Sequence, residues 1–172
     1  ISELDKRLTL YKKKNNAYNF NDIARMAIKV VDLNSDVREE LIKSFNEILV
    51  DEYQDTSDTQ EKFISLISNN NVYMVGDIKQ SIYRFRNANP NIFRNKYNNY
   101  ANSNGGMKID LLKNFRSREE VLANINLIFD YIMDDYIGGA EYQEGHRMVF
   151  GNTTYNIEGK TEQNNNLEIY NY

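Results

Sequence analysis

The 172-residue sequence contains no cysteine, one proline and one histidine. Without cysteine, the chain has no disulfide framework and no cysteine-based zinc or redox site. Its apolar runs are only a few residues long, far short of the roughly 20 residues that a membrane-spanning helix needs. The amino-terminal residues are charged and show no signal-peptide pattern. These absences favour a cytoplasmic protein with no membrane partner.

Acidic residues are scarce in one stretch of an otherwise acidic chain. Between residues 79 and 118 there are nine Lys or Arg and one acid, so the formal charge of this stretch is +8. Because the net charge of the whole chain is −4, the remaining residues carry −12. A basic block in an acidic protein is a candidate surface for phosphates. The alternative is an ordinary solvated face.

Hydrophobic periodicity predicts alternating helices and strands in the first half of the chain. Short β-branched runs indicate buried strands over 47–51 and 72–77. Ser57 and Gln60 have the capping-box spacing that begins a helix between these strands. Strand, helix and strand in this order predict a right-handed crossover and a parallel sheet. Two amphipathic helices are expected before the first strand, at 23–31 and 37–45.

The second half shows a weaker alternation. We expect a helix over 92–100, a break at 101–108 and a strand over 108–112. Ser117 and Glu120 form a second capping-box pattern, followed by a strongly periodic helix. The chain therefore continues as an α/β protein.

Both predicted strands end in an acidic residue. The first ends in Asp51, with Glu52 directly after it, and the second ends in Asp77. In open parallel sheets, ligands bind outside the carboxyl ends of the strands. A carboxylate there can hold Mg²⁺ while the metal bridges phosphate oxygens, and a neighbouring carboxylate can orient and deprotonate a water. The alternative is that the acid pair only starts a turn or caps the next helix.

Aromatic and basic residues alternate in the stretch GDIKQSIYRFRNA. If this stretch is extended, Tyr83 and Phe85 lie on one side and Arg84 and Arg86 on the other. Aromatic rings stack on unpaired bases, and arginines bind phosphates. Gln80 is a neutral group suited to sensing a phosphate oxygen or a positioned water. Alternatively, the aromatics belong to the core and the arginines to the surface.

An arginine precedes the second capping-box pattern, in the stretch LLKNFRSREE. Held at the end of a short strand, Arg116 resembles an arginine finger, which stabilises charge on a transferring phosphoryl group. Phe115 beside it could stack on a base. Alternatively, Arg116 pairs with Glu119 or Glu120 on the helix surface.

Taken in order, VDEYQDT, VGDIKQSIYRFR and NFRSR resemble the second, third and fourth motifs of superfamily-one DNA helicases of the UvrD/PcrA/Rep/RecB group. Within that group, GDIKQSIYRFRNANPNIFRNKY is most similar to the AddA family, which supplies one subunit of the bacterial ATP-dependent helicase/nuclease. The resemblance covers about residues 20–151, is most specific over 47–118, and is poor over the final twenty or so residues.

The resemblance implies a partial RecA-like sheet of the P-loop NTPase type, parallel and flanked by helices, with the start of a second RecA-like lobe. Residues 1–103 would form the carboxyl part of the first motor lobe, with the helices that lead into it. Residues 104–137 would begin the second lobe, and 138–172 would begin an insertion or a poorly ordered tail.

The resemblance also implies roles for the motif residues. Asp51 matches the Mg²⁺-associated acid and Glu52 the general base for ATP hydrolysis. Gln80 matches a glutamine that contacts the γ-phosphate and couples it to DNA, and Arg116 a γ-phosphate arginine from the second lobe. The other residues expected at the nucleotide are Asp77, Arg86 and Phe115. The residues expected against single-stranded DNA are Tyr83, Arg84 and Phe85.

The implied function is a segment of an ATP-dependent DNA helicase, with an associated exonuclease in the full-length protein, that unwinds DNA for double-strand break repair by recombination. ATP and Mg²⁺ are the implied cofactors, and single- and double-stranded DNA and a second subunit the implied partners. No phosphate-loop sequence G-x-x-x-x-G-K-[ST] occurs. We therefore expect an internal slice of a larger protein, in which these residues alone neither hydrolyse ATP nor bind it tightly.

Two other classes of function stay open from the residues alone. A non-catalytic nucleic-acid-binding module would use the basic block and the aromatics, with Asp51 and Glu52 serving only structure. A metal nuclease built on the acids is less favoured, because Asp51, Glu52 and Asp77 lack the further acid and lysine spacing of a nuclease centre.

Overall fold

The structure is a computed structural model that describes residues 2–134, 136–138, 141–142, 145–152 and 154. The chain forms two compact units. The first comprises the residues up to Asp77 together with Ser81–Phe93, and the second comprises Ile78–Gln80 and the residues from Arg94 onward. Within the described ranges, no helix is long and apolar enough to cross a membrane.

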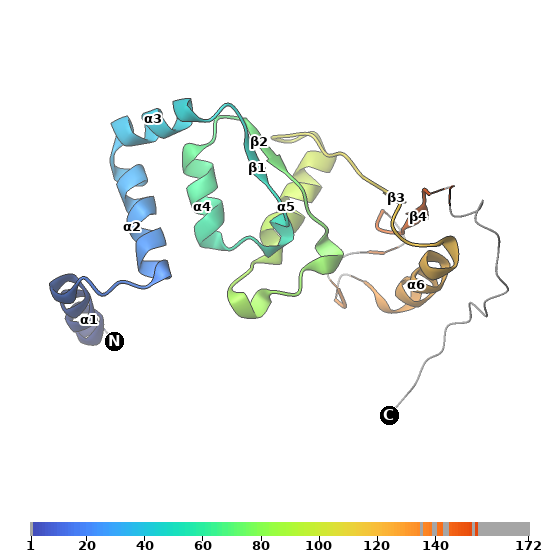
Figure 1. The fold of residues 1–172 in the computed structure, drawn as a ribbon, viewed down its shortest axis with the longest axis horizontal. Helices are drawn as coiled ribbons and strands as arrows, with labels where there is room; N and C mark the ends of the chain where they lie inside the picture. The colour runs from blue at the N-terminus through green and yellow to red at the C-terminus, as the bar shows by residue number, and fades with distance from the viewer. Residues whose placement is uncertain (1, 135, 139–140, 143–144, 153, 155–172) are drawn as a thin grey trace. The chain divides into compact units, whose positions relative to one another are not determined.

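The first unit contains a short sheet and helices, of which the second, third and fourth pack on one another (Figure 1). Its helices are α1 (Ser2–Asn15), α2 (Phe20–Leu33), α3 (Ser35–Ser44) and α4 (Asp58–Ile67). The capping box that begins α4 is confirmed, since Ser57 Oγ accepts from the Gln60 N–H and the Gln60 side chain accepts from the Ser57 N–H. The two predicted amphipathic helices are also confirmed, as α2 and α3.

The sheet of the first unit has two parallel strands, β1 (Ile48–Val50) and β2 (Val72–Met74), joined through α4. Leu49 lies opposite Tyr73 in the register. The parallel pairing is therefore confirmed, with strands shorter than expected. In the described residues the sheets have only two strands each, so the fold is mixed α/β without a full RecA-like sheet.

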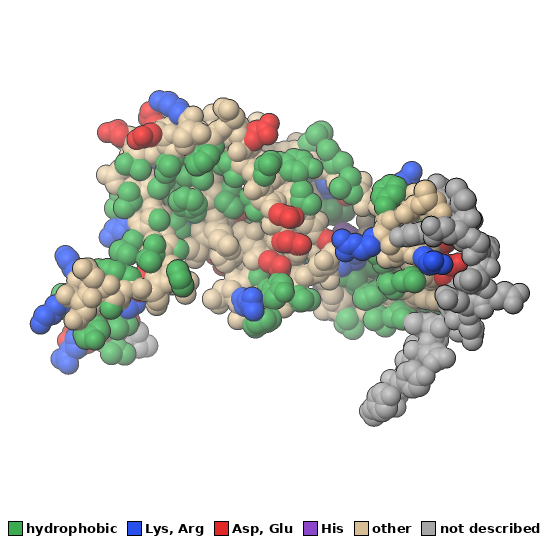
Figure 2. Space-filling view, viewed as in Figure 1, with side chains coloured by type: hydrophobic (Ala, Val, Ile, Leu, Met, Phe, Trp, Pro, Cys, Tyr) green, Lys and Arg blue, Asp and Glu red, His purple; other side chains and the backbone are tan. Residues whose placement is uncertain are grey.

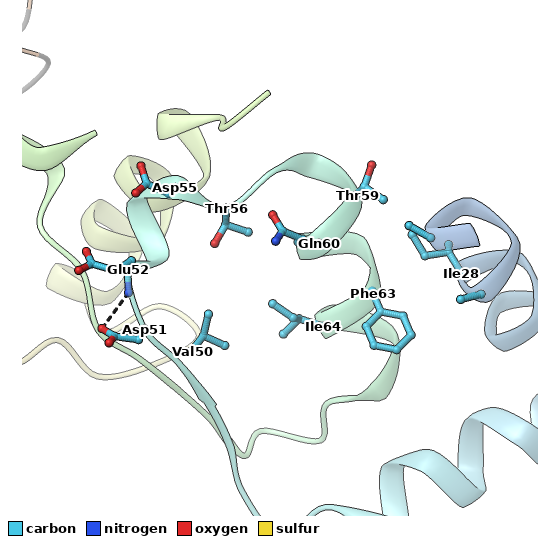
Figure 3. Close-up of a pocket in the computed structure, with 12 residues that line it drawn as sticks. Ile28, Val50, Asp51, Glu52, Asp55, Thr56, Thr59, Gln60, Phe63 and Ile64 are labelled. Atoms are coloured by element: carbon cyan, nitrogen blue, oxygen red, sulfur yellow. Dashed lines mark hydrogen bonds between the residues drawn. The ribbon is translucent and has the colours of Figure 1, made fainter. Parts of the chain in front are cut away.

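One face of this sheet is open. In Figure 3 Val50 lies across from Ile64 of α4. Because side chains alternate across a strand, Leu49 points to the opposite face. Leu49 is 70% exposed and its partner Tyr73 is 56% exposed. Parallel sheets are usually covered on both faces. This unit by itself covers one face and leaves an apolar face exposed.

The second unit packs around a buried amide. Its elements are β3 (Lys113–Asn114), α6 (Glu119–Ile132) and β4 (Val149–Phe150), and α5 (Pro90–Ala101) runs into it from the first unit. The Asn126 side chain accepts from the Tyr142 hydroxyl at 2.7 Å and donates to the Met148 carbonyl at 2.9 Å. Since Asn126 and Tyr142 are buried, these bonds fix how the segment before β4 packs on α6.

Two sequence predictions in this unit are wrong. Residues 108–112 form no strand, and Ile109 and Leu111 are exposed, because the ladder with β4 begins only at the Leu112 carbonyl, which accepts from the Val149 N–H. The second capping box is also absent. Helix α6 begins one residue later than the pattern implies, and the Ser117 N–H donates instead to the Asn114 side chain at 2.9 Å.

Candidate functional site

The chain leaves the regular ladder at the end of β1. Val75 donates its N–H to the Val50 carbonyl at 2.9 Å and accepts from the Tyr53 N–H at 2.8 Å. In a regular parallel ladder, the two residues that bond to one residue of the neighbouring strand are two positions apart. Here Val50 and Tyr53, which both bond to Val75, are three positions apart. The extra residue makes a β-bulge. Because the bulge turns Asp51 and Glu52 out of the ladder, both are exposed, and the Glu52 N–H donates to Asp51 Oδ1 at 2.8 Å.

Glu52 has a strained backbone. Its φ of 48° and ψ of 44° place it in the left-handed region, which costs a residue with a Cβ about 1–3 kcal/mol. The turn that follows, Tyr53–Asp55, is anchored in the core and holds Glu52 in this conformation. Tyr53 is 2% exposed, and its hydroxyl donates to the Glu61 carboxylate at 2.5 Å. Such strain is found preferentially at active and binding sites, so it favours a functional role for Glu52.

Gln54 connects the ends of the two strands, and sequence reasoning missed it. Its side chain is buried, donates from Nε2 to Glu52 Oε2 at 2.6 Å, and accepts at Oε1 from the Asp77 N–H at 3.0 Å. A Cβ on Gly76 would lie 2.8 Å from Gln54 Oε1. The only signal in the sequence is a glutamine after an acid pair and a glycine before Asp77.

A pocket of about 490 Å³ opens beside the bulge, between α2, α4 and the end of β1. In Figure 3 the carboxylates of Asp51, Glu52 and Asp55 gather at one end, whereas Ile28 and Phe63 lie at the other. Figure 2, drawn from the same side as Figure 1, shows a row of acidic side chains where β1 ends. The pocket therefore has an apolar wall and an acidic rim.

Asp55, an acid on this rim, has a perturbed pKa. Burial, and then the negative charge of Glu52, raise the pKa of the Asp55 carboxyl above its ordinary value of 3.8. Its Oδ1 atom is buried and has no hydrogen-bond partner in the structure. The ionised form of Asp55 is therefore disfavoured by its surroundings.

Asp55→Asn is expected to stabilise the 172-residue chain near neutral pH. The folded state holds the Asp55 proton more tightly than the unfolded chain, so wild-type stability falls as the pH rises above 3.8 and through the folded pKa. The variant escapes this loss. Its Tm should match that of the wild type at about pH 3 and exceed it at about pH 7. Glu47→Gln, at an exposed acid before β1, is the control, and a lower Tm of Asp55→Asn at every pH would contradict the expectation.

The aromatic and basic cluster of the first unit is not extended, which corrects the sequence expectation. Residues Arg84–Arg86 form a 3-10 turn. The Arg86 guanidinium lies 5.2 Å from the Tyr83 ring centroid and 5.5 Å from that of Phe85, so arginine and aromatics share one side. Phe85 is 76% exposed and Tyr83 37% exposed, so the interpretation of both as core aromatics is wrong. We call Tyr83, Phe85 and Arg86 the aromatic–arginine cluster.

The remaining candidate residues divide between the two units. Asp77 belongs to the first unit with Asp51 and Glu52, whereas Gln80, at the end of the turn Ile78–Gln80, belongs to the second. Arg116 and Phe115 are also in the second unit and are exposed. The Arg116 N–H donates to Asn114 Oδ1 at 3.0 Å, and the Phe115 carbonyl accepts from the Asn152 amide. The end of β3 thus presents both side chains to solvent.

The residues at the bulge fit a magnesium ion held together with phosphates. Within the described ranges, no group of three or more His, Cys, Asp or Glu side chains could hold a metal by itself. Asp51 offers an exposed carboxylate of which one oxygen accepts the Glu52 N–H. Mg²⁺ is commonly bound through one or two carboxylates plus substrate phosphates, and a single exposed carboxylate suits that arrangement.

The known proteins that the chain resembles are described in similar terms, as helicase/nuclease or exonuclease/helicase subunits. An ATP-dependent helicase/nuclease subunit of Lactococcus lactis subsp. lactis (strain IL1403) is 46% identical over 162 residues, which are 92% of this chain and 14% of that protein. The exonuclease/helicase subunit RexA of L. lactis subsp. cremoris (strain MG1363) is 45% identical over 162 residues, with the same coverage. An ATP-dependent helicase/nuclease subunit of Streptococcus pyogenes serotype M18 (strain MGAS8232) is 46% identical over 142 residues, 81% of this chain and 12% of that protein.

These relatives are much longer than the chain, which spans about one seventh of their length. The RexA alignment covers 92% of the chain, so the similarity extends past the expected limits of residues 20 and 151. Residues 1–101 match the family described as UvrD/REP helicase N-terminal domain. The bulge with its two acids lies inside this match. The chain therefore belongs to the UvrD/REP helicase family.

Proposed function

We propose that the chain is a segment of an ATP-dependent DNA helicase with an associated exonuclease, which unwinds DNA for double-strand break repair by recombination. The bulge at the end of β1 carries this proposal, because it presents Asp51 and a strained Glu52 side by side. The relatives named as ATP-dependent helicase/nuclease subunits support the same function. The full-length protein acts in the cytoplasm with a second subunit.

The site residues divide the chemistry of ATP hydrolysis. Asp51 would hold Mg²⁺, which when bound would supply positive charge against the phosphates of ATP. Glu52 orients the attacking water and takes its proton. Gln80 contacts the γ-phosphate, and Arg116 stabilises the negative charge that grows on the transferring phosphoryl group. Asp77, Arg86 and Phe115 complete the nucleotide site.

Tyr83 and Phe85 of the aromatic–arginine cluster serve the single strand of DNA, whereas its Arg86 belongs to the nucleotide site. Phe85 and Tyr83 expose their rings, and rings of this kind stack on bases without sequence preference. Arg84, in the same turn, binds the phosphate backbone. Hydrolysis at Glu52 then drives translocation along that strand.

The 172 residues alone are inactive in this proposal. No phosphate-loop sequence occurs in them, and backbone N–H groups of such a loop normally cradle the phosphates of ATP. Robust DNA-stimulated ATP hydrolysis by the purified chain would contradict this. A full-length protein that binds DNA but never hydrolyses ATP would replace the helicase with a non-catalytic nucleic-acid-binding module.

Arg116→Ala in the full-length protein tests the motor. We expect DNA-stimulated ATP hydrolysis to fall on the order of 1,000-fold, as for loss of an arginine finger. The measurements are kcat for ATP and ATP-driven unwinding of a DNA duplex. Arg118→Ala is the control, since it removes the same charge two residues away on an exposed side chain. Equal losses in both variants would contradict the assigned role.

A further inference from the structure

We propose that Gln54 is a positioning residue for ATP hydrolysis, whose buried amide aims the Glu52 carboxylate and ties it to the backbone of Asp77. The proposal rests on the proposed function, because it takes Glu52 as the general base. Gln54 itself is 1% exposed and does not reach a bound substrate directly. Its effect passes through the two groups that it contacts.

The chemistry of the partners fixes which way the amide points. The Asp77 N–H can only donate, so it requires the Gln54 oxygen, which lies 3.0 Å away. The ionised Glu52 carboxylate can only accept, so it requires the Gln54 Nε2, which lies 2.6 Å away. A flipped amide would lose both bonds at once. The orientation of Gln54 is thus set at both ends, and the bond to the carboxylate is of the stronger, charge-assisted kind.

The packing around Gln54 leaves its side chain little room to move. The Gly76 backbone passes so close that a Cβ there would lie 2.8 Å from Gln54 Oε1 and 3.2 Å from its backbone nitrogen. The Ser81 hydroxyl donates to the Gln54 carbonyl at 3.3 Å. Glu52 is otherwise an exposed side chain on a bulge, so a rigid buried donor is what restricts its carboxylate.

The same contacts join the two strand ends mechanically. The Asp77 N–H belongs to the segment that continues within three residues to Gln80, the proposed γ-phosphate contact. A shift of the Asp77 backbone moves Gln54 Oε1, which accepts the Asp77 N–H. Because Nε2 belongs to the same amide, the donor to Glu52 moves with it. The Gln54 amide therefore couples the position of the base to the conformation of the segment after β2.

Gln54→Glu in the full-length protein tests the contact with Glu52. The variant keeps an oxygen for the Asp77 N–H and puts its second oxygen against the Glu52 carboxylate. Two carboxylates at this distance repel each other, so the Glu52 carboxylate should leave the position in which the Gln54 amide holds it. We expect kcat for ATP hydrolysis to fall on the order of 10- to 100-fold, while binding of a non-hydrolysable ATP analogue stays within about twofold. An unchanged kcat beside a lowered Tm would mark Gln54 as purely structural and overturn the proposal.

Gln54→Met, of similar length and without hydrogen bonds, tests positioning by a second route. We expect kcat to fall on the order of 10- to 100-fold, while binding of a non-hydrolysable ATP analogue stays within about twofold. A wild-type kcat would overturn the proposal. So would failure of both Gln54 variants to fold, since that outcome would mark Gln54 as purely structural.

Glu52→Gln separates this inference from the proposed function. If Gln54 acts through Glu52, adding Gln54→Met to Glu52→Gln should cause no further loss of kcat. A further loss in the double variant would overturn the inference alone. Normal hydrolysis by Glu52→Gln would remove the general base and both proposals with it, whereas an inactive Glu52→Gln beside a fully active Gln54→Met would remove only the inference.

Discussion

Replacing Glu52 with glutamine is expected to lower ATP hydrolysis by the full-length protein about 100- to 10,000-fold, the range for loss of a general base. The amide has nearly the same shape, so it still meets Gln54 and still occupies the bulge. It cannot take a proton from water, whereas ATP binding does not need that proton transfer. The kcat of DNA-stimulated hydrolysis and the Kd of a non-hydrolysable ATP analogue measure the two effects separately.

Glu47→Gln is the matched control for this experiment. Glu47 is an exposed glutamate before β1, outside the bulge and the pocket, and the same change there should leave kcat unaltered. Retained turnover in Glu52→Gln would exclude Glu52 as the base. Loss of analogue binding together with turnover would indicate that Glu52 contributes to holding the nucleotide rather than to the proton transfer.

Removing the rings of Tyr83 and Phe85 is expected to weaken binding of single-stranded DNA by about 1–3 kcal/mol each, or about 5- to 150-fold in Kd. Because the two rings lie 5.9 Å apart and share the Arg86 guanidinium, the double variant should lose less than the sum. Fluorescence anisotropy with a labelled oligonucleotide measures the Kd of each full-length variant.

Phe20→Ala controls for simple loss of an exposed ring in the first unit, since Phe20 is 90% exposed. It should leave DNA affinity unchanged. If Tyr83→Ala and Phe85→Ala instead keep full affinity and lower Tm, the two rings serve packing. Stability should change little in Phe85→Ala, because this side chain is 76% exposed.

Local sequence patterns predicted those structural elements that are stabilised by interactions between residues close in the sequence. The Ser57–Gln60 box is a contact between residues three apart, and it begins α4 as expected. The second box failed because a residue outside the pattern, Asn114, takes the Ser117 N–H. Likewise, KIDLL has strand-like residues, but a strand also needs a partner, and the ladder with β4 starts only at its last residue.

The candidate site was predictable only in part for the same reason. The position of Asp51 and Glu52 at the end of an apolar strand follows from hydrophobicity alone, whereas the bulge depends on which hydrogen bonds Val75 makes. Gln54 joins Glu52, two positions away, to Asp77, 23 positions away, and no local pattern contains the second contact. Alternation in YRFR suggested an extended chain, but cation–π contacts of Arg86 with two rings accompany a turn instead.

The close approach at Gly76 has an evolutionary consequence. A methyl group there would lie 2.8 Å from Gln54 Oε1 and also 2.8 Å from Phe93 Cε2, and relieving one clash leaves the other. A lineage could accept alanine at position 76 only after both neighbours had shrunk or moved. If Gln54 positions Glu52 as proposed, shrinking Gln54 would release Glu52, and selection for hydrolysis would close that path. Substitutions at Gln54, Gly76 and Phe93 are therefore linked. Position 76 should change far more slowly than is usual for an exposed glycine in a loop.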